Sequence, residues 1–251
     1  MKRLITMGLL LNSLTGISAT LPDKYTELVD YVQPSPDQGE TVTCLYVAST
    51  GVMELLANKK AGNKDPVPYG IYDLSESFLI SAPPARKKGN FLELPVHRFN
   101  IGYGVHVDEW PFEAWNSSVP NQRVWNRRNW SRMKKLPLPK VKTIPLFKFG
   151  KSRWSTRVLK HSHVQEIKEA LVKYRSPVLI NYNDNNYWHV ISIVGYDDTL
   201  PGNCYQITSK ECAQSTGSFY VRDSFGVGVE VRDYDWLKIK VNTAVVVTES
   251  K

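Results

Sequence analysis

Three short segments constrain this chain more than its composition does, because each brings one chemically active side chain. In chain order they supply a thiol, an imidazole and a carboxylate. The segments are residues 37–44, 188–197 and 219–226. A thiol is a weak nucleophile until a positioned base takes its proton. The segments can act together only in a fold that brings these distant stretches to one place.

The clearest helical pattern begins at Cys44 and runs to residue 59. Its apolar residues cover a broad surface, which favours a buried helix, and Thr43 precedes it as a plausible N-cap. At this position Cys44 would meet exposed backbone N–H groups and the positive end of the helix dipole, both of which favour a thiolate. The alternative is an inert Cys44 that packs as the first apolar residue of the helix.

Gln38 lies six residues before Cys44, in a loop that contains Gly39. Its side-chain amide can donate a hydrogen bond to an oxyanion, with the backbone N–H of Cys44 as a second donor. The alternative is a surface glutamine without a role. Gln38 is therefore a candidate site residue only because of its six-residue spacing from Cys44.

His189 opens a strand pattern in which side chains alternate between two faces, and Asp223 follows on a later strand. If the two strands pair antiparallel, Asp223 can bond one ring nitrogen of His189 and leave the other facing Cys44, while Phe225 shields that bond from water. The alternatives are a structural histidine and a turn-capping aspartate. His161 and His163 alternate but lack a third ligand of convincing spacing, so we expect no metal and no cofactor.

Hydrophobic spacing indicates an α+β protein, helical in its first half and rich in strands after Pro177. A ligand site is expected in a cleft between two such lobes. Helical patterns cover residues 25–32, 44–59, 74–79 and 164–174, and strand patterns cover 178–182, 188–196, 217–223, 227–231 and 244–248.

The first 19 residues resemble a secretory signal, with Lys2 and Arg3 before an apolar run too short for the roughly 20 residues of a membrane span. This predicts an exported chain, secreted or periplasmic, with no membrane span; the alternative is an amphipathic or buried helix. In an oxidising compartment Cys204 and Cys212 would pair as a disulfide across their polar loop, which leaves Cys44 as the odd thiol.

The net charge of +8 is concentrated in residues 114–165, which hold 13 Lys and Arg and no Asp or Glu. Interleaved basic and aromatic residues predict either a long surface loop or a site for an anionic polymer. We expect no nucleic acid partner, because an exported protein rarely meets one.

Together these segments resemble the papain-like cysteine peptidase family. Gln38, Gly39 and Cys44 resemble its segment of Gln, Gly and catalytic Cys, with the same spacing. Residues 222–226 resemble its Arg-Asn-Ser-Trp-Gly segment. Further matches are residues 189–198 after the catalytic His, Leu-Ser-Glu at 74–76 and Trp-Pro-Phe at 110–112.

The resemblance implies a two-lobe α+β fold in a domain from residue 20 to residue 251. It has a helical lobe at about 37–113, a basic linker at 114–163, an antiparallel β-sheet or barrel lobe at about 164–251, and an active-site cleft between the lobes. The implied activity is hydrolysis of peptide bonds in peptide or protein substrates by a thiolate–imidazolium pair. The implied catalytic residues are Cys44, His189, Asp223 and Gln38.

The chain departs from the family pattern at several positions. Asp223 stands where the family has Asn. Only 24 residues, 20–43, separate the predicted signal cleavage site from Cys44, which leaves no room for the family's propeptide. Further departures are Leu45 and Phe225 for Trp, and Thr41 for Cys. They motivate two alternatives. One is a catalytically silent papain-fold protein that binds an anionic partner through the basic segment. The other is a thiol amidase acting on cell-wall peptides.

Overall fold

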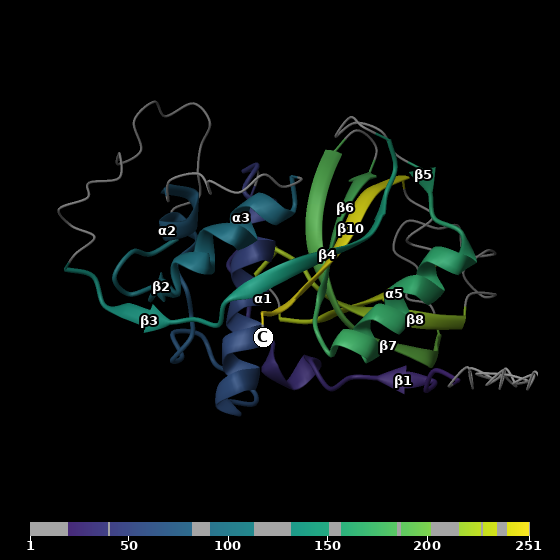
Figure 1. Cartoon of the computed structure of the whole chain (residues 1–251), viewed down its shortest axis with the longest axis horizontal. Helices are drawn as coiled ribbons and strands as arrows, with labels where there is room; N and C mark the ends of the chain where they lie inside the picture. Colours follow the sequence, from purple (N-terminus) through teal and green to yellow (C-terminus); the bar gives the residue numbers. More distant parts are fainter. Residues whose placement is uncertain are drawn as a thin grey trace, which may run out of the picture.

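The computed structural model describes most of the chain, and Figure 1 shows its arrangement. The described residues are 20–39, 41–81, 91–112, 132–150, 157–184, 187–201, 216–226, 228–234 and 240–250. The predicted signal at 1–19 and the predicted Cys204–Cys212 disulfide lie outside these ranges.

Helix α1, Cys44–Ala61, is the central helix of the helical part and is buried along most of its length. It ends at Gly62, whose positive φ of 70° suits glycine. Thr43 occupies the predicted N-cap position, but the predicted capping by its side chain is wrong. The Thr43 hydroxyl makes no capping hydrogen bond and instead hydrogen-bonds with the hydroxyl of Thr41 at 2.7 Å.

Two shorter α-helices accompany α1, and a serine side chain caps one of them. Helix α2, Glu76–Ser81, is preceded by Ser75, whose hydroxyl accepts the N–H of Phe78 at 3.0 Å. The other elements of this part are α3, Glu93–Arg98, and the 3-10 helices η1, Val29–Tyr31, and η2, Phe99–Ile101. The helical pattern expected at 25–32 is only partly correct, because Lys24–Tyr25 forms strand β1 and pairs with β7.

The described strands of the second half form an antiparallel sheet with the order β4-β10-β6-β7-β8-β9. The predicted pairing of the strands that carry His189 and Asp223 is confirmed, because β7 and β8 are antiparallel neighbours. The strands are β4, Val141–Lys148; β6, Val178–Asp184; β7, Tyr187–Pro201; β8, Thr216–Arg222; β9, Glu230–Asp233; and β10, Lys240–Glu249.

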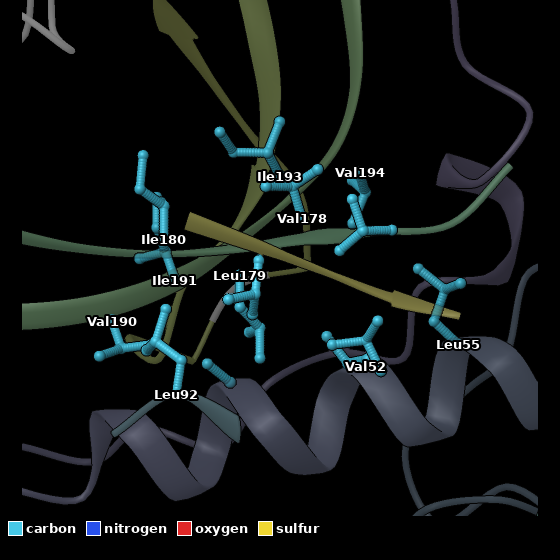
Figure 2. Close-up of a cluster of buried hydrophobic side chains, with 14 of the residues drawn as sticks. Val52, Leu55, Leu92, Val178, Leu179, Ile180, Val190, Ile191, Ile193 and Val194 are labelled. Atoms are coloured by element: carbon cyan, nitrogen blue, oxygen red, sulfur yellow. The ribbon is translucent and has the colours of Figure 1, made fainter. Parts of the chain in front are cut away.

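The core lies where α1 meets this sheet, and helix α5, His161–Tyr174, also packs against the sheet (Figure 1). In Figure 2, Val52 and Leu55 of α1 face the aliphatic side chains of the central strands. The centres of β6 and β7 are buried and largely apolar, with Val178, Leu179 and Ile180 on β6 and Val190, Ile191, Ile193 and Val194 on β7. The predicted α+β class is confirmed.

Part of the basic segment is a strand of the main sheet, which differs from the expected surface loop. Residues 141–148 form β4, which pairs with β10 at the edge of the sheet. Pro145 is tolerated there because an edge strand has one side without a ladder partner. Two short strands, β3 at Lys135–Pro137 and β5 at Arg157–Val158, also fall in this segment; β3 pairs with β2, Tyr103–Val105, and β5 pairs with β10.

None of the helices among the described residues is long and apolar enough to cross a membrane.

Candidate active site

Cys44 is the first residue of α1 and is largely buried, with 7% of its surface exposed. Its thiol lies near His189, which belongs to β7, and the two side chains interact electrostatically. The helical part and the sheet thus place the sulfur and the imidazole in one region. The start of a helix supplies N–H groups that stabilise negative charge at this sulfur.

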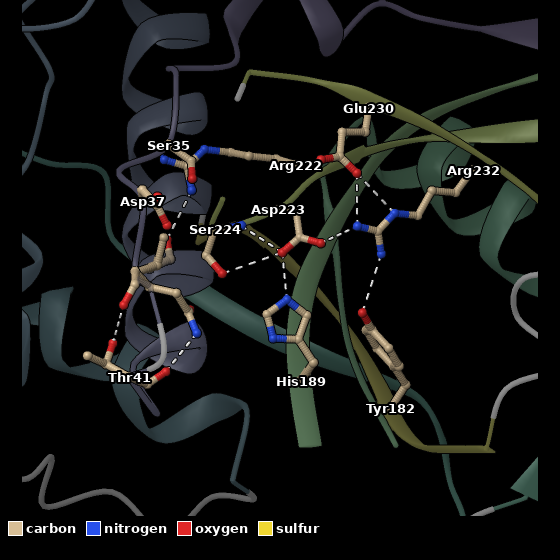
Figure 3. A network of polar contacts seen from close by, with 12 residues as sticks. Ser35, Asp37, Thr41, Tyr182, His189, Arg222, Asp223, Ser224, Glu230 and Arg232 are labelled. Carbon is tan, nitrogen blue, oxygen red and sulfur yellow. Dashed lines mark hydrogen bonds and ion pairs between the residues drawn. The ribbon is translucent and has the colours of Figure 1, made fainter. Parts of the chain in front are cut away.

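Asp223, which directly follows β8, holds the other side of the imidazole. The Nε2 atom of His189 lies 2.5 Å from Oδ1 of Asp223, so the ring nitrogen left for Cys44 is Nδ1 (Figure 3). The same Oδ1 accepts the backbone N–H of Ser224 at 2.7 Å. Both side chains are buried, which protects this hydrogen bond from competition with water.

Two aromatic side chains fix the plane of the His189 ring. Phe225 stacks on it with ring centroids 5.3 Å apart and an interplanar angle of 18°, and Tyr182 of β6 contacts it edge-on at 5.6 Å and 90°. The predicted shielding role of Phe225 agrees with this contact. Phe225 is 45% exposed, so it forms the boundary between the imidazole and solvent.

The surroundings of His189 favour its charged form. Burial by itself lowers the pKa of His189, but the hydrogen bonds and negative charges of Asp223 and Cys44 outweigh burial and raise it from 6.5 to about 9. Burial likewise acts to raise the pKa of Asp223, but its bond to His189 and the positive charges of His189 and Arg232 lower it overall. The site therefore favours an imidazolium beside a carboxylate at neutral pH.

Gln38 is fully buried in the loop that leads to α1. Its side-chain amide donates to the carbonyl oxygen of Thr41 at 2.8 Å, which orients the amide within the loop. The backbone of this loop is bonded to the segment after Asp223, through the N–H of Gln38 and a β-bridge between Asp37 and Phe225. All four predicted site residues thus lie in one region.

Sequence reasoning missed a second group of polar residues next to Asp223. The guanidinium of Arg232 on β9 contacts Oδ2 of Asp223, bonds Glu230 through Nη2 at 2.9 Å, and donates from Nη1 to the hydroxyl of Tyr182 at 3.3 Å (Figure 3). The usable signal was the alternation of Glu230 and Arg232, which places both on one face of a strand.

A buried ion pair anchors the segment before Asp223 to the central helix. Nη2 of Arg222 lies 3.1 Å from Oε2 of Glu54, and the same guanidinium donates to the backbone carbonyls of Gln33 and Val47. Gly51 leaves the space that this side chain crosses, because an added Cβ would lie 2.0 Å from Nη1 of Arg222. The pair thereby fixes the backbone that carries Asp223.

Within the described part of the chain, no group of three or more His, Cys, Asp or Glu side chains is placed to hold a metal ion.

The sequence matches no protein-family model and no curated protein. Solved structures do match. The clostridial cysteine protease Cwp84 superposes with a TM-score of 0.55 and 16% identity, over 91% of this chain and 58% of its own. Bromelain from Ananas comosus, solved with an inhibitor, superposes with a TM-score of 0.53 and 14% sequence identity. The match covers 92% of this chain and 100% of the bromelain chain.

A digestive procathepsin from the larval midgut of Tenebrio molitor superposes with a TM-score of 0.52 and 15% sequence identity. The match covers 92% of this chain and 69% of the procathepsin chain. This chain spans little more than half of each of two Cwp84 structures, 58% and 53%. At these identities the likeness concerns the fold. The agreement covers the helical part and the sheet together, and this chain therefore has the papain-like fold of the cysteine peptidases.

Proposed function

We propose that this protein is a thiol peptidase that hydrolyses peptide bonds in peptide or protein substrates. The observation that carries the proposal is the order Cys44–His189–Asp223, in which Asp223 hydrogen-bonds the imidazole and Cys44 interacts with it electrostatically. The three residues come from α1, β7 and the position after β8. A nucleophile next to a base that is itself oriented by a third group is the arrangement that nucleophilic catalysis requires. The fold alone would not carry this conclusion, because folds host silent members.

In the proposed reaction the thiolate of Cys44 attacks the scissile carbonyl carbon, and the carbonyl oxygen becomes an oxyanion. The Gln38 amide and the Cys44 backbone N–H stabilise that oxyanion. The imidazolium of His189 gives its proton to the leaving amine as the C–N bond breaks, which leaves a thioester. Water then attacks the thioester carbonyl carbon, and His189 takes a proton from that water. The C–S bond breaks, which releases the carboxylic acid product and restores the Cys44 thiolate beside the His189 imidazolium.

The test combines labelling with hydrolysis. A peptide-like epoxide should alkylate Cys44 at mildly acidic pH, located by mass spectrometry, and the chain should cleave members of a fluorogenic peptide library. Cys44→Ala should abolish both activities and His189→Ala should abolish cleavage. His161→Ala changes an exposed histidine of α5 and should alter neither.

A chain that labels slowly, and only as pH nears the ordinary thiol value of about 8.5, contradicts the proposal. So does a purified, folded chain that cleaves no peptide in the library. The latter result together with slow labelling would favour a silent papain-fold protein. The comparisons lend no support to an anionic polymer as partner.

We also infer that the chain is exported. The support is the charged and apolar character of residues 1–19 and the pair of cysteines, Cys204 and Cys212, in one polar loop. One of the matched structures is described as a surface-layer-associated protein of Clostridium difficile. Sequencing the N-terminus of the secreted product should give Thr20, and a thiol titration should count one free thiol. An uncleaved product retained inside the cell would contradict the inference.

A further inference from the structure

We propose that Arg232 is a positioning residue of this site, which compensates the charge of Asp223 and so sets the proton affinity of His189. The inference rests on the proposed function only for its effect on rate. Its effect on His189 can be measured without any substrate.

The register of the sheet explains how Arg232 reaches the site. On β9, Arg232 lies opposite Phe219 of β8, and Glu230 lies opposite Val221. Positions 219, 221 and 223 alternate onto one face, so Arg232 and Asp223 project to the same side. Arg232 is only 4% exposed. A buried guanidinium of this kind requires partners for its charge.

Asp223 divides its two oxygens between two cations. Oδ1 receives His189 at 2.5 Å and the N–H of Ser224, whereas Oδ2 receives Arg232. Tyr182 closes the ring of contacts, because its hydroxyl accepts from Arg232 while its ring edge meets His189. Arg232 is thus connected to the imidazole along two routes, through a carboxylate and through an aromatic ring.

The charges around the imidazole come from four side chains. Asp223 hydrogen-bonds His189 and Cys44 lies near it, whereas Arg232 and the half-buried Glu230 lie on the far side of Asp223. With a thiolate at Cys44, the Cys44–His189 pair and the Asp223–Arg232 pair are each neutral. An uncharged amide at position 223 would need no arginine behind it. Without the arginine, Oδ2 of the buried carboxylate would lose its cationic partner, which is unfavourable.

The prediction is therefore reciprocal. Asp223→Asn removes the negative charge and leaves Arg232 facing the imidazole, so the pKa of His189 should fall by about 1 to 3 pH units. Arg232→Gln removes the positive charge, so the pKa of His189 should rise. The double variant D223N/R232Q removes both charges. The pKa of His189 in it should be higher than in Asp223→Asn and closer to the value in the chain that keeps both residues.

The experiment follows the imidazole proton resonances of His189 by NMR over pH, with every variant made in a Cys44→Ala background. This background removes the thiol and makes the titration independent of peptidase activity. Arg175→Gln serves as the matched control, because Arg175 forms an exposed ion pair with Glu27. It should leave the His189 titration unchanged.

The rate gives the second readout, in chains that keep Cys44. Asp223→Asn should lower kcat/KM, and adding Arg232→Gln to this variant should raise kcat/KM again by about tenfold. The effects of the two substitutions are then not additive, as expected for residues in contact. If Arg232 were merely structural, the losses in kcat/KM of the two single variants would add in the double variant, and Arg232→Gln would leave the pKa of His189 unchanged. Either result overturns the proposal.

If Arg232→Gln alone does not fold, the comparison of Asp223→Asn with the double variant still decides, since neither keeps the buried carboxylate of Asp223 without its arginine. Equal His189 pKa values in those two chains would contradict the proposal. A chain without peptidase activity that shows the reciprocal titration would refute the proposed function and leave the role of Arg232 intact.

Discussion

The backbone N–H of Gln38 donates to the carbonyl oxygen of Ser224 at 2.9 Å. This bond joins the loop before Cys44 to the segment after Asp223. The amide that would stabilise an oxyanion and the carboxylate that orients His189 are thus held on one connected backbone. Main-chain contacts hold this loop in addition to the bond from the Gln38 side chain to Thr41, so part of the anchoring remains when that side chain is changed.

We predict that Gln38→Ala lowers kcat by about 10²–10³ and changes KM little, because an oxyanion donor acts on the transition state. Steady-state kinetics on a cleaved peptide give both constants. Alkylation by iodoacetamide, which forms no oxyanion, should proceed at the natural rate in this variant. A fall in alkylation of the same size as the fall in kcat would assign Gln38 to the structure of the loop instead.

Phe225→Ala should lower kcat/KM on the order of tenfold, part of the roughly 10²–10⁴ that general acid–base catalysis contributes. The ring stacks on His189 and stands between the imidazole and solvent, so its loss admits water to the His189–Asp223 bond. Phe225→Trp retains the stacking surface and should keep most of the activity. Equal activity in the alanine and tryptophan variants would contradict this role.

The sequence predicted the parts of the site that depend on local patterns. Cys44 was located by the start of an apolar helix, and His189 by the alternation of a strand. Arg232 was missed because its contact with Asp223 depends on the register between β8 and β9. The expected strand at 227–231 ends before Arg232, whereas the observed strand begins at Glu230 and includes it.

Strand β4 shows the same limit in the fold. Its pairing with β10 joins residues about a hundred positions apart, and no local signal specifies that partner. Its alternation is also irregular, since only Val141 in the strand is fully buried and Pro145 interrupts the pattern. The sequence of β4 therefore resembles that of a surface loop. Its assignment as a strand depends on its pairing with β10 at the edge of the sheet.

Gly51→Ala should destabilise the fold by about 2–5 kcal/mol, through overpacking and loss of a buried ion pair. The new methyl group would lie 2.0 Å from Nη1 and 2.3 Å from Cζ of Arg222, which has little room to move. Denaturant unfolding measures the change. Gly228→Ala is the matched control, because nothing lies within 4 Å of its added Cβ, and it should change stability by less than about 0.5 kcal/mol.

The buried carboxyl of Glu76 should make stability fall as pH rises between about 4.5 and 7. Burial raises the pKa of Glu76 to about 7, against the lowering effect of Arg222. In this window the folded chain holds a proton that the unfolded chain has released, so raising pH favours unfolding, by up to about 3 kcal/mol.

Glu76→Gln should reduce the slope of that part of the stability profile, measured by denaturant unfolding at several pH values. Burial also raises the pKa of Glu54, which contributes to the same slope. Glu109→Gln, which changes an exposed carboxylate, should leave the profile unchanged. A profile of the same slope in the Glu76→Gln chain would show that other groups govern this window.

The ultraviolet absorption of a thiolate tests the Cys44–His189 pair most directly. The difference spectrum between the natural chain and Cys44→Ser should show thiolate below pH 7, because the pKa of about 9 at His189 keeps the imidazolium beside the sulfur. A thiolate signal that appears only near pH 8.5, the ordinary value for a free thiol, would contradict the account.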